Sequence, residues 1–131
     1  MNPKKIILCV DDEKVVLTSL IGQLNNAFGT QYIYEGFTSP EEALEYLDEL
    51  KEEGAAPDLI ISDWLMPRLR GDEFLIRARH MFPDTRLMML SGHADPTSVE
   101  RAVHEAGLFR FMTKPWDKED LVRQVELAIA N

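Results

Sequence analysis

Two adjacent aspartates come directly after an apolar run near the start of the chain. The run covers residues 6–10, and Asp11 and Asp12 follow it. Carboxylates this close repel each other and lose hydration together, so the pair needs a cation to be stable. A hard divalent ion such as Mg²⁺ takes oxygen ligands. The pair therefore predicts a metal site and, through the metal, chemistry on a phosphoryl group.

Three further residues that could do chemistry also follow apolar runs. Asp63 comes after residues 59–62, Ser91 after residues 87–90, and Lys114 after residues 109–113. The acids could hold Mg²⁺, and one of them could act as a nucleophile. The hydroxyl and the ammonium could bind phosphoryl oxygens. These roles require that the fold bring the side chains together.

Five apolar runs alternate with five helical patterns. Most of the runs are nearly continuous in apolar residues, which is typical of strands covered on both faces. The second run is more polar and predicts an edge strand. The predicted strands cover residues 6–10, 32–37, 59–62, 87–90 and 109–113.

The helices are predicted from apolar spacing and from capping residues. The first has apolar residues at helical spacing from Leu17 to Phe28 and ends at Gly29; the second begins with a capping box at residues 39–42 and stops near Gly54. The third covers about residues 72–82, and Asp117 caps the fifth.

The fourth helix should begin at Asp95 and Pro96, because this pair combines a capping side chain with a proline at the first helical position. Gly107 should end it. Helical spacing predicts that its buried face consists of Val99, Ala102, Val103 and Ala106.

Strands that alternate with helices over short links predict an α/β fold, with a parallel sheet, right-handed crossovers and helices on both faces. Ligands of such sheets bind beyond the carboxyl ends of the strands. The aspartates, the serine and the lysine all follow strands, so we expect them at that edge. At 131 residues the chain predicts a single domain over residues 1–131.

Composition excludes several classes of function. The formal net charge of −9 disfavours direct binding to nucleic acid or to an anionic membrane. Cys9 is the only cysteine, so no internal disulfide is expected, and its apolar surroundings predict a core residue. No apolar run reaches membrane-spanning length and no signal peptide is recognisable, which predicts a cytoplasmic location.

The chain resembles the response-regulator receiver domains of two-component signalling over essentially its full length. The matching fragments are Val10-Asp11-Asp12-Glu13, Asp63-Trp64-Leu65-Met66-Pro67 with Gly71, Ser91-Gly92, and Lys114-Pro115-Trp116. The resemblance implies a flavodoxin-like, doubly wound (βα)5 fold with a five-stranded parallel sheet in the order 2-1-3-4-5.

The resemblance also implies a set of roles. Asp63 would be the phosphoacceptor, taking its phosphoryl group from a phosphohistidine of a histidine kinase or a phosphotransfer protein. Asp12, Asp63 and the backbone carbonyl of Leu65 would bind Mg²⁺, with Mn²⁺ as a substitute, and Asp11 would act through a metal-bound water. Lys114 would pair with a phosphoryl oxygen.

Ser91 and Phe111 match the switch residues of the family. Ser91 would move toward the phosphoryl group, and Phe111 would fill the space that it leaves. The change would alter the surface made of the fourth helix, the fifth strand and the fifth helix, which would control an output partner or domain and could also form a homodimer. Pro115 would follow a cis peptide bond.

Two positions depart from the commonest family pattern. Leu65 and His93 stand where side chains flank the path of the water that hydrolyses the acyl phosphate. Leucine has no hydrogen-bonding group with which to orient that water. We therefore predict slow self-dephosphorylation.

Three alternatives remain at the level of the sequence. An Asp-dependent phosphatase of an α/β class would have an Asp-x-Asp motif after the first strand, whereas here the two acids are adjacent. A flavin- or nucleotide-binding module would have a glycine- or hydroxyl-rich loop at the same place. A receiver-like scaffold without phosphotransfer would not need the acids, Ser91 and Lys114. The receiver resemblance implies no enzyme beyond self-phosphorylation and self-dephosphorylation.

Overall fold

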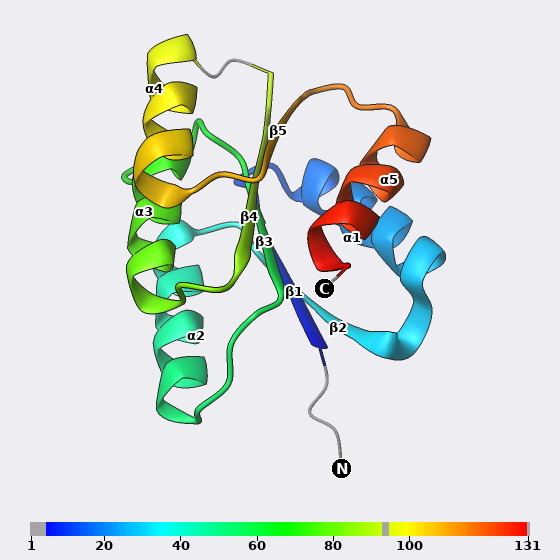
Figure 1. Ribbon diagram of the computed structural model, residues 1–131. Helices are drawn as coiled ribbons and strands as arrows, with labels where there is room; N and C mark the ends of the chain where they lie inside the picture. Colours follow the sequence, from blue (N-terminus) through cyan, green and yellow to red (C-terminus); the bar gives the residue numbers. More distant parts are fainter. Residues whose placement is uncertain (1–4, 93–94, 131) are drawn as a thin grey trace.

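All five predicted strands pair in one parallel sheet. The structure is a computed structural model that describes residues 5–92 and 95–130. The strands pair in the order β2-β1-β3-β4-β5, so the expected flavodoxin-like (βα)5 topology is confirmed and the polar second strand lies at an edge (Figure 1). Their bounds are β1 Lys5–Val10, β2 Tyr32–Phe37, β3 Leu59–Ser62, β4 Arg86–Ser91 and β5 Arg110–Thr113.

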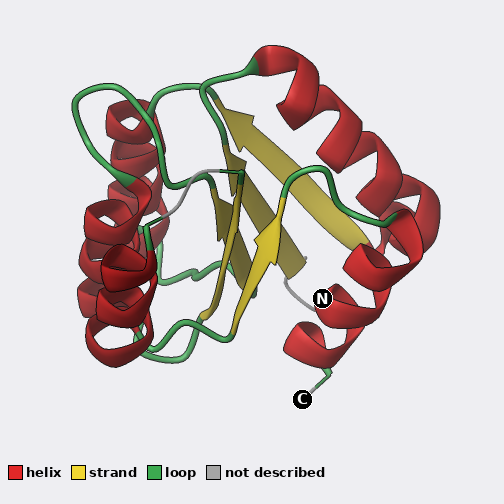
Figure 2. Cartoon of the chain, turned by 90° about the horizontal axis from the view of Figure 1, so that it is seen from above, coloured by secondary structure: helices red, strands yellow, loops and turns green. Residues whose placement is uncertain are grey.

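Five helices cover the two faces of the sheet. Helices α2, α3 and α4 lie on one face, and α1 and α5 lie on the other (Figures 1 and 2). Their bounds are α1 Lys14–Phe28, α2 Pro40–Glu52, α3 Gly71–Met81, α4 Pro96–Arg101 and α5 Lys118–Ile129. None of the helices described here is long and apolar enough to cross a lipid bilayer.

Side-chain caps fix where α2, α4 and α5 begin. Ser39 accepts a hydrogen bond from the backbone N–H of Glu42, and Asp95 accepts one from that of Thr97. Such caps satisfy N–H groups that have no partner inside the helix. At the other end of α1, Gly29 has a φ of 65°, a conformation that glycine adopts without strain. The predicted starts of α2 and α4 and the predicted end of α1 are therefore confirmed.

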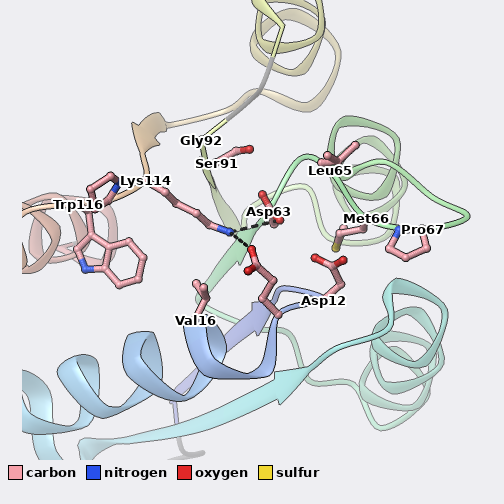
Figure 3. Close-up of a pocket in the computed structure, with 12 residues that line it drawn as sticks. Asp12, Val16, Asp63, Leu65, Met66, Pro67, Ser91, Gly92, Lys114 and Trp116 are labelled. Carbon is pink, nitrogen blue, oxygen red and sulfur yellow. Dashed lines mark ion pairs between the residues drawn. The ribbon is translucent and has the colours of Figure 1, made fainter.

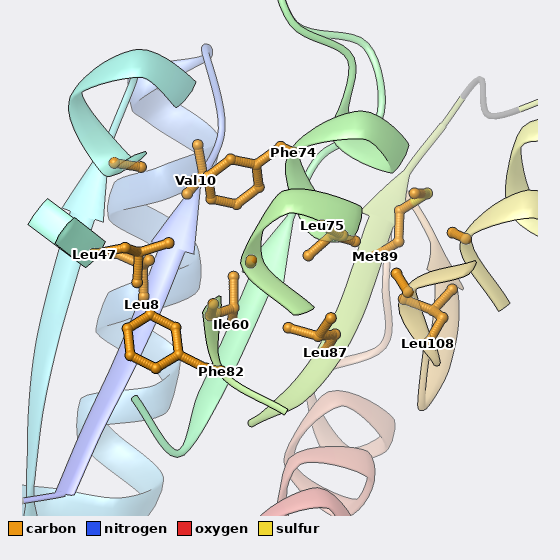
Figure 4. Close-up of a cluster of buried hydrophobic side chains, with 14 of the residues drawn as sticks. Leu8, Val10, Leu47, Ile60, Phe74, Leu75, Phe82, Leu87, Met89 and Leu108 are labelled. Atoms are coloured by element: carbon orange, nitrogen blue, oxygen red, sulfur yellow. The ribbon is translucent and has the colours of Figure 1, made fainter. Parts of the chain in front are cut away.

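A hydrophobic core fills the space on each side of the sheet. In β1, Leu8 and Val10 pack toward α2 and α3 (Figure 4), whereas Ile7 and Cys9 face the layer of α1 and α5. This alternation follows from the two-residue period of a strand. Because both faces of the central strands are buried, their near-continuous apolar sequences are explained.

The predicted buried face of the fourth helix is partly wrong. Ala102 and Ala106 are fully buried as expected, but the side chain of Val103 is 45% exposed. After Arg101 the chain continues as a π-helical turn over Ala102–Ala106, before Gly107 ends it with a φ of 67°. A π-helical turn holds more residues than an α-helical turn, so a face calculated with the α-helical period points the wrong way.

Candidate functional site

The five residues singled out for chemistry lie at one edge of the sheet. Asp11 and Asp12 follow β1, Asp63 follows β3, Ser91 ends β4 and Lys114 follows β5. Four of them line an open pocket of about 710 Å³ (Figure 3). Asp11 does not line the pocket but forms an ion pair with Lys114, which does. The pocket is lined by Asp12, Glu13, Val16, Asp63, Leu65, Met66, Pro67, Ser91, Gly92, Lys114, Pro115 and Trp116.

The three aspartates form one group of carboxylates. Each offers an oxygen, and these oxygens lie within 4.8 Å of one another. Asp11 and Asp63 are almost fully buried, at 2% and 5% exposure, whereas Asp12 is exposed at the pocket mouth. An oxygen-only donor set of this kind suits a hard divalent cation. The group could therefore hold a metal ion.

Backbone groups orient the two buried carboxylates. Oδ1 of Asp63 accepts a hydrogen bond of 2.8 Å from the N–H of Trp64, and Oδ1 of Asp11 accepts one of 2.9 Å from the N–H of Glu13. Each of these bonds leaves the second oxygen of its carboxylate facing Lys114. The local chain thus determines which oxygen of each acid meets the lysine.

Gly71 allows α3 to begin directly against the segment that carries Asp63 and Trp64. Its N–H donates a hydrogen bond of 2.7 Å to the carbonyl of Trp64. A Cβ at this position would overlap the backbone carbonyl oxygen of Asp63. Only glycine lacks that atom, so the close approach explains why this residue type stands here.

Lys114 joins two of the three acids. Its Nζ lies 2.6 Å from Oδ2 of Asp11 and 3.3 Å from Oδ2 of Asp63. Figure 3 shows the contact with Asp63. Burial lowers the pKa of Lys114, but the hydrogen bond to Asp11 and the charges of Asp11 and Asp63 outweigh burial, so the pKa is raised. The ammonium therefore stays charged at neutral pH. The peptide bond between Lys114 and Pro115 is cis, as the resemblance implied.

The negative charges of the aspartates are compensated only in part by Lys114. Burial raises the pKa of Asp11, and the charge of Asp63 adds to the rise although Lys114 opposes it. Burial also raises the pKa of Asp12, again with a contribution from Asp63. One ammonium thus offsets only part of the crowded negative charge. A bound cation would remove the remainder, which agrees with the donor chemistry of the group.

Apolar side chains form the rim of the pocket. Leu65 is 54% exposed, and Val16 and Trp116 stand on the opposite side of the opening (Figure 3). The indole N–H of Trp116 donates a hydrogen bond of 2.8 Å to Oε1 of Gln23 in α1. Sequence reasoning missed this contact, because nothing in the local pattern pairs residues 93 positions apart.

The predicted switch residues occupy different places. Ser91 lines the pocket, whereas Phe111 does not; it is partly buried and packs against the core on the side of α2 and α3. Ser91 and Thr113 are paired in register, and Phe111 pairs with Met89 two residues earlier. His93, the other position predicted to affect hydrolysis, lies outside the described residues.

Comparison with known proteins identifies one family. The model of the response regulator receiver domain matches residues 7–126. Among solved structures, the signal receiver domain of an HD domain-containing protein from Pseudomonas fluorescens Pf-5 is 26% identical with a TM-score of 0.84, covering 98% of this chain and 89% of the other. An uncharacterised protein from Neptuniibacter caesariensis is 34% identical with a TM-score of 0.81, covering 98% and 90%.

The curated relatives are longer proteins. The hydrogenase transcriptional regulatory protein HoxA of Bradyrhizobium diazoefficiens is 31% identical over 129 residues, which is 98% of this chain and 25% of that protein. The chain therefore spans about a quarter of the length of this relative, and a similar share of the HoxA protein of Cupriavidus necator.

Proposed function

The chain belongs to the response-regulator receiver domains of two-component systems, and from this membership we propose that it is a phosphoryl-accepting signalling switch whose acceptor is Asp63. One observation carries the proposal. The ammonium of Lys114 lies between Asp11 and Asp63, beside a group of three carboxylates, in an open pocket at the carboxyl edge of the sheet. A phosphoryl group needs an acceptor oxygen and opposing positive charge together.

The proposed reaction is a transfer between two side chains. An oxygen of the Asp63 carboxylate attacks the phosphorus of a phosphohistidine, the P–N bond breaks, and the imidazole of the donor leaves and takes up a proton. The product is an aspartyl phosphate. Lys114 pairs with one phosphoryl oxygen, and the hydroxyl of Ser91 donates a hydrogen bond to another. Self-phosphorylation and the later hydrolysis are the only reactions in this proposal.

The metal ion of the proposal is Mg²⁺, with Mn²⁺ as a substitute. Asp12, Asp63 and the backbone carbonyl of Leu65 would hold it, with Asp11 as an additional acid behind them. When bound, the cation reduces the repulsion between the acidic pocket and the incoming phosphoryl group. Lys114 supplies the second positive charge, from a position set by Asp11.

The proposed output is a change of the surface made of α4, β5 and α5. Ser91 would approach the phosphoryl group, and Phe111, on the neighbouring strand, would turn into the space behind it. A phenylalanine has no hydroxyl to keep in water, so Phe111 should favour the inward orientation more than tyrosine would. The Phe111→Tyr variant should accordingly bind an output partner with a different affinity.

Partners follow from the same proposal. The phosphoryl donor would be a histidine kinase or a phosphotransfer protein. An output domain or protein would respond to the phosphorylated form. The names of the relatives, a transcriptional regulatory protein and an HD domain-containing protein, point to outputs of more than one kind. A second copy of the chain could bind through α4, β5 and α5. A single domain over residues 1–131 and a cytoplasmic location stay predictions.

Phosphorylation at a single aspartate tests the proposal. With acetyl phosphate and Mg²⁺, the intact mass should rise by one phosphoryl group in the wild type and in Asp48→Asn, an exposed control on α2. It should not rise in Asp63→Asn or in wild type with a chelator. An unmodified wild type, or a phosphorylated Asp63→Asn variant, would refute the assignment. Sustained turnover of small phosphoesters would instead favour an Asp-dependent phosphatase.

A further inference from the structure

A short loop connects Lys114 to helix α5. The loop consists of residues 114–117, between the end of β5 and the start of α5. The N–H of Lys114 donates a hydrogen bond of 3.2 Å to the carbonyl of Ser91, which fixes the first residue of the loop on β4. Asp117 caps α5 and fixes the last residue. Between these two fixed ends, Trp116 has a side chain that could attach the loop to a neighbouring element.

Trp116 ties this loop to α1. Its indole N–H donates a hydrogen bond of 2.8 Å to Oε1 of Gln23, and its ring packs against the core that α1 and α5 share. Helix α1 begins directly after the segment that carries Asp11. The segment of Asp11 with α1 and the segment of Lys114 are therefore joined twice, by the ion pair of 2.6 Å between Lys114 and Asp11 and by the Trp116–Gln23 bond.

We propose that Trp116 and Gln23 are positioning residues for Lys114. Their hydrogen bond holds the loop against α1 so that the ammonium reaches Asp11 and Asp63 together. A lysine side chain has a flexible four-carbon stem, so its Nζ is held well only when its backbone is also fixed. The inference rests on the proposed function, because it concerns the group that meets the phosphoryl oxygens.

Variants that remove one partner test the hydrogen bond directly. Trp116→Phe keeps an aromatic ring but loses the N–H, and Gln23→Met keeps the length of the side chain but loses the acceptor. Each should lower the rate of phosphorylation by acetyl phosphate about threefold to tenfold, the equivalent of one net hydrogen bond. Gln23→Glu restores an acceptor oxygen and should recover most of the rate. Gln31→Met, exposed in the turn after α1, serves as a control.

Three further measurements separate positioning from general damage. The affinity for Mg²⁺ should not fall in Trp116→Phe or Gln23→Met, because backbone N–H groups outside the loop orient the carboxylates of Asp11 and Asp63. The Trp116→Phe/Gln23→Met double variant should be no slower than either single variant, since both remove the same bond. In a Lys114→Ala background, Trp116→Phe should have no further effect on the rate.

The outcomes distinguish this inference from the proposed function. A wild type that takes up no phosphoryl group would overturn both. A wild type that is phosphorylated, with a Trp116→Phe variant of equal rate, would overturn the positioning role alone. So would an additional loss of rate when Trp116→Phe is combined with Lys114→Ala, because Trp116 would then act by another route.

Discussion

At the scale of single residues, the site is defined by carboxylates that are only partly neutralised. Asp11 is buried and paired with Lys114, whereas Asp12 is exposed and lies beside Asp63. The pKa of Asp12 is raised, first by loss of hydration and then by the charge of Asp63. An acid whose pKa is higher in the folded state than in the unfolded state destabilises the fold once it is ionised.

The sign of this effect gives a prediction for Asp12→Asn. Without metal at pH 7, the variant should melt at a higher temperature than wild type, because it lacks an ionised group that opposes folding. The difference should vanish well below the ordinary pKa of 3.8, where the carboxyl group is protonated in both states. Thermal melting in chelator at several pH values measures it. A lower melting temperature for the variant in chelator at pH 7 would contradict the argument.

Added Mg²⁺ supplies the matching control. It should raise the melting temperature of wild type, since binding to the folded state alone stabilises that state. It should raise that of Asp12→Asn much less, because one of the proposed ligands is gone. Equal shifts in both proteins would exclude Asp12 from the metal site.

Leu65 gives a second prediction at this scale. Its side chain is 54% exposed on the pocket rim and has no group that could hold a water for attack on phosphorus. The Leu65→Asn variant should therefore lose its phosphoryl group faster than wild type. The half-life of the intact phosphorylated mass measures this after the donor is removed. Leu127→Asn, at a similarly exposed position of α5, should leave the half-life unchanged, and a longer half-life for Leu65→Asn would refute the prediction.

At the scale of elements, an ion cluster joins α3 to α4. Asp72 in the first turn of α3 is fully buried, with Arg101 of α4 at 3.4 Å and Arg70 at 3.3 Å. Arg101 also meets Glu73 at 3.0 Å and Glu105 at 2.6 Å. The contacts between exposed partners contribute little, whereas a buried carboxylate without its cation is strongly destabilising. Asp72 is therefore the member whose pairing matters.

Removing Arg101 should show how far the stability of the fold depends on the pairing of Asp72. Arg101→Met should lower the free energy of unfolding, but by less than the loss of a fully buried pair would, because Arg101 is 40% exposed and Arg70 remains. The Asp72→Asn/Arg101→Met double variant should recover part of the loss, since the buried charge is then gone. Urea unfolding measures both. Arg123→Met, which removes an exposed pair on α5, should change stability by less than about 0.5 kcal/mol. A double variant less stable than Arg101→Met would argue against the mechanism.

The elements also show where prediction from sequence stops. The strands, the caps at Ser39, Asp95 and Asp117 and the ends at Gly29 and Gly107 follow from local signals, because each depends on a few neighbouring residues. The exposure of Val103 does not, because it depends on a π-helical turn that nothing in the local pattern announces.

At the scale of the whole molecule, the two core layers enclose Cys9. It is fully buried in β1, and burial, with the charge of Asp11, raises the pKa of its thiol to about 12. Because the thiolate is the reactive form, the native protein should react very slowly with a thiol reagent at pH 8. Labelling should then proceed only through unfolding.

Labelling of Cys9 therefore reports on the stability of the entire fold. Its rate should rise with urea in step with the unfolded population, and Mg²⁺ should lower it by stabilising the folded state. Fully unfolded protein, which should be labelled at once, gives the reference rate. Prompt stoichiometric labelling of the folded protein without urea would mean that β1 opens locally and would contradict the prediction.

The sequence by itself determined the order of elements, the parallel sheet and the edge at which the polar residues meet. These follow from short-range periodicity, from caps, and from the rule that strands connected through a helix run parallel, so that their carboxyl ends meet at one edge. Only the tertiary structure decided which side chains touch: Lys114 with Asp11 at 2.6 Å, Trp116 with Gln23, and Arg101 with Asp72. Those contacts join elements far apart in sequence, and they depend on how loops and helices pack on the sheet, which no local pattern encodes.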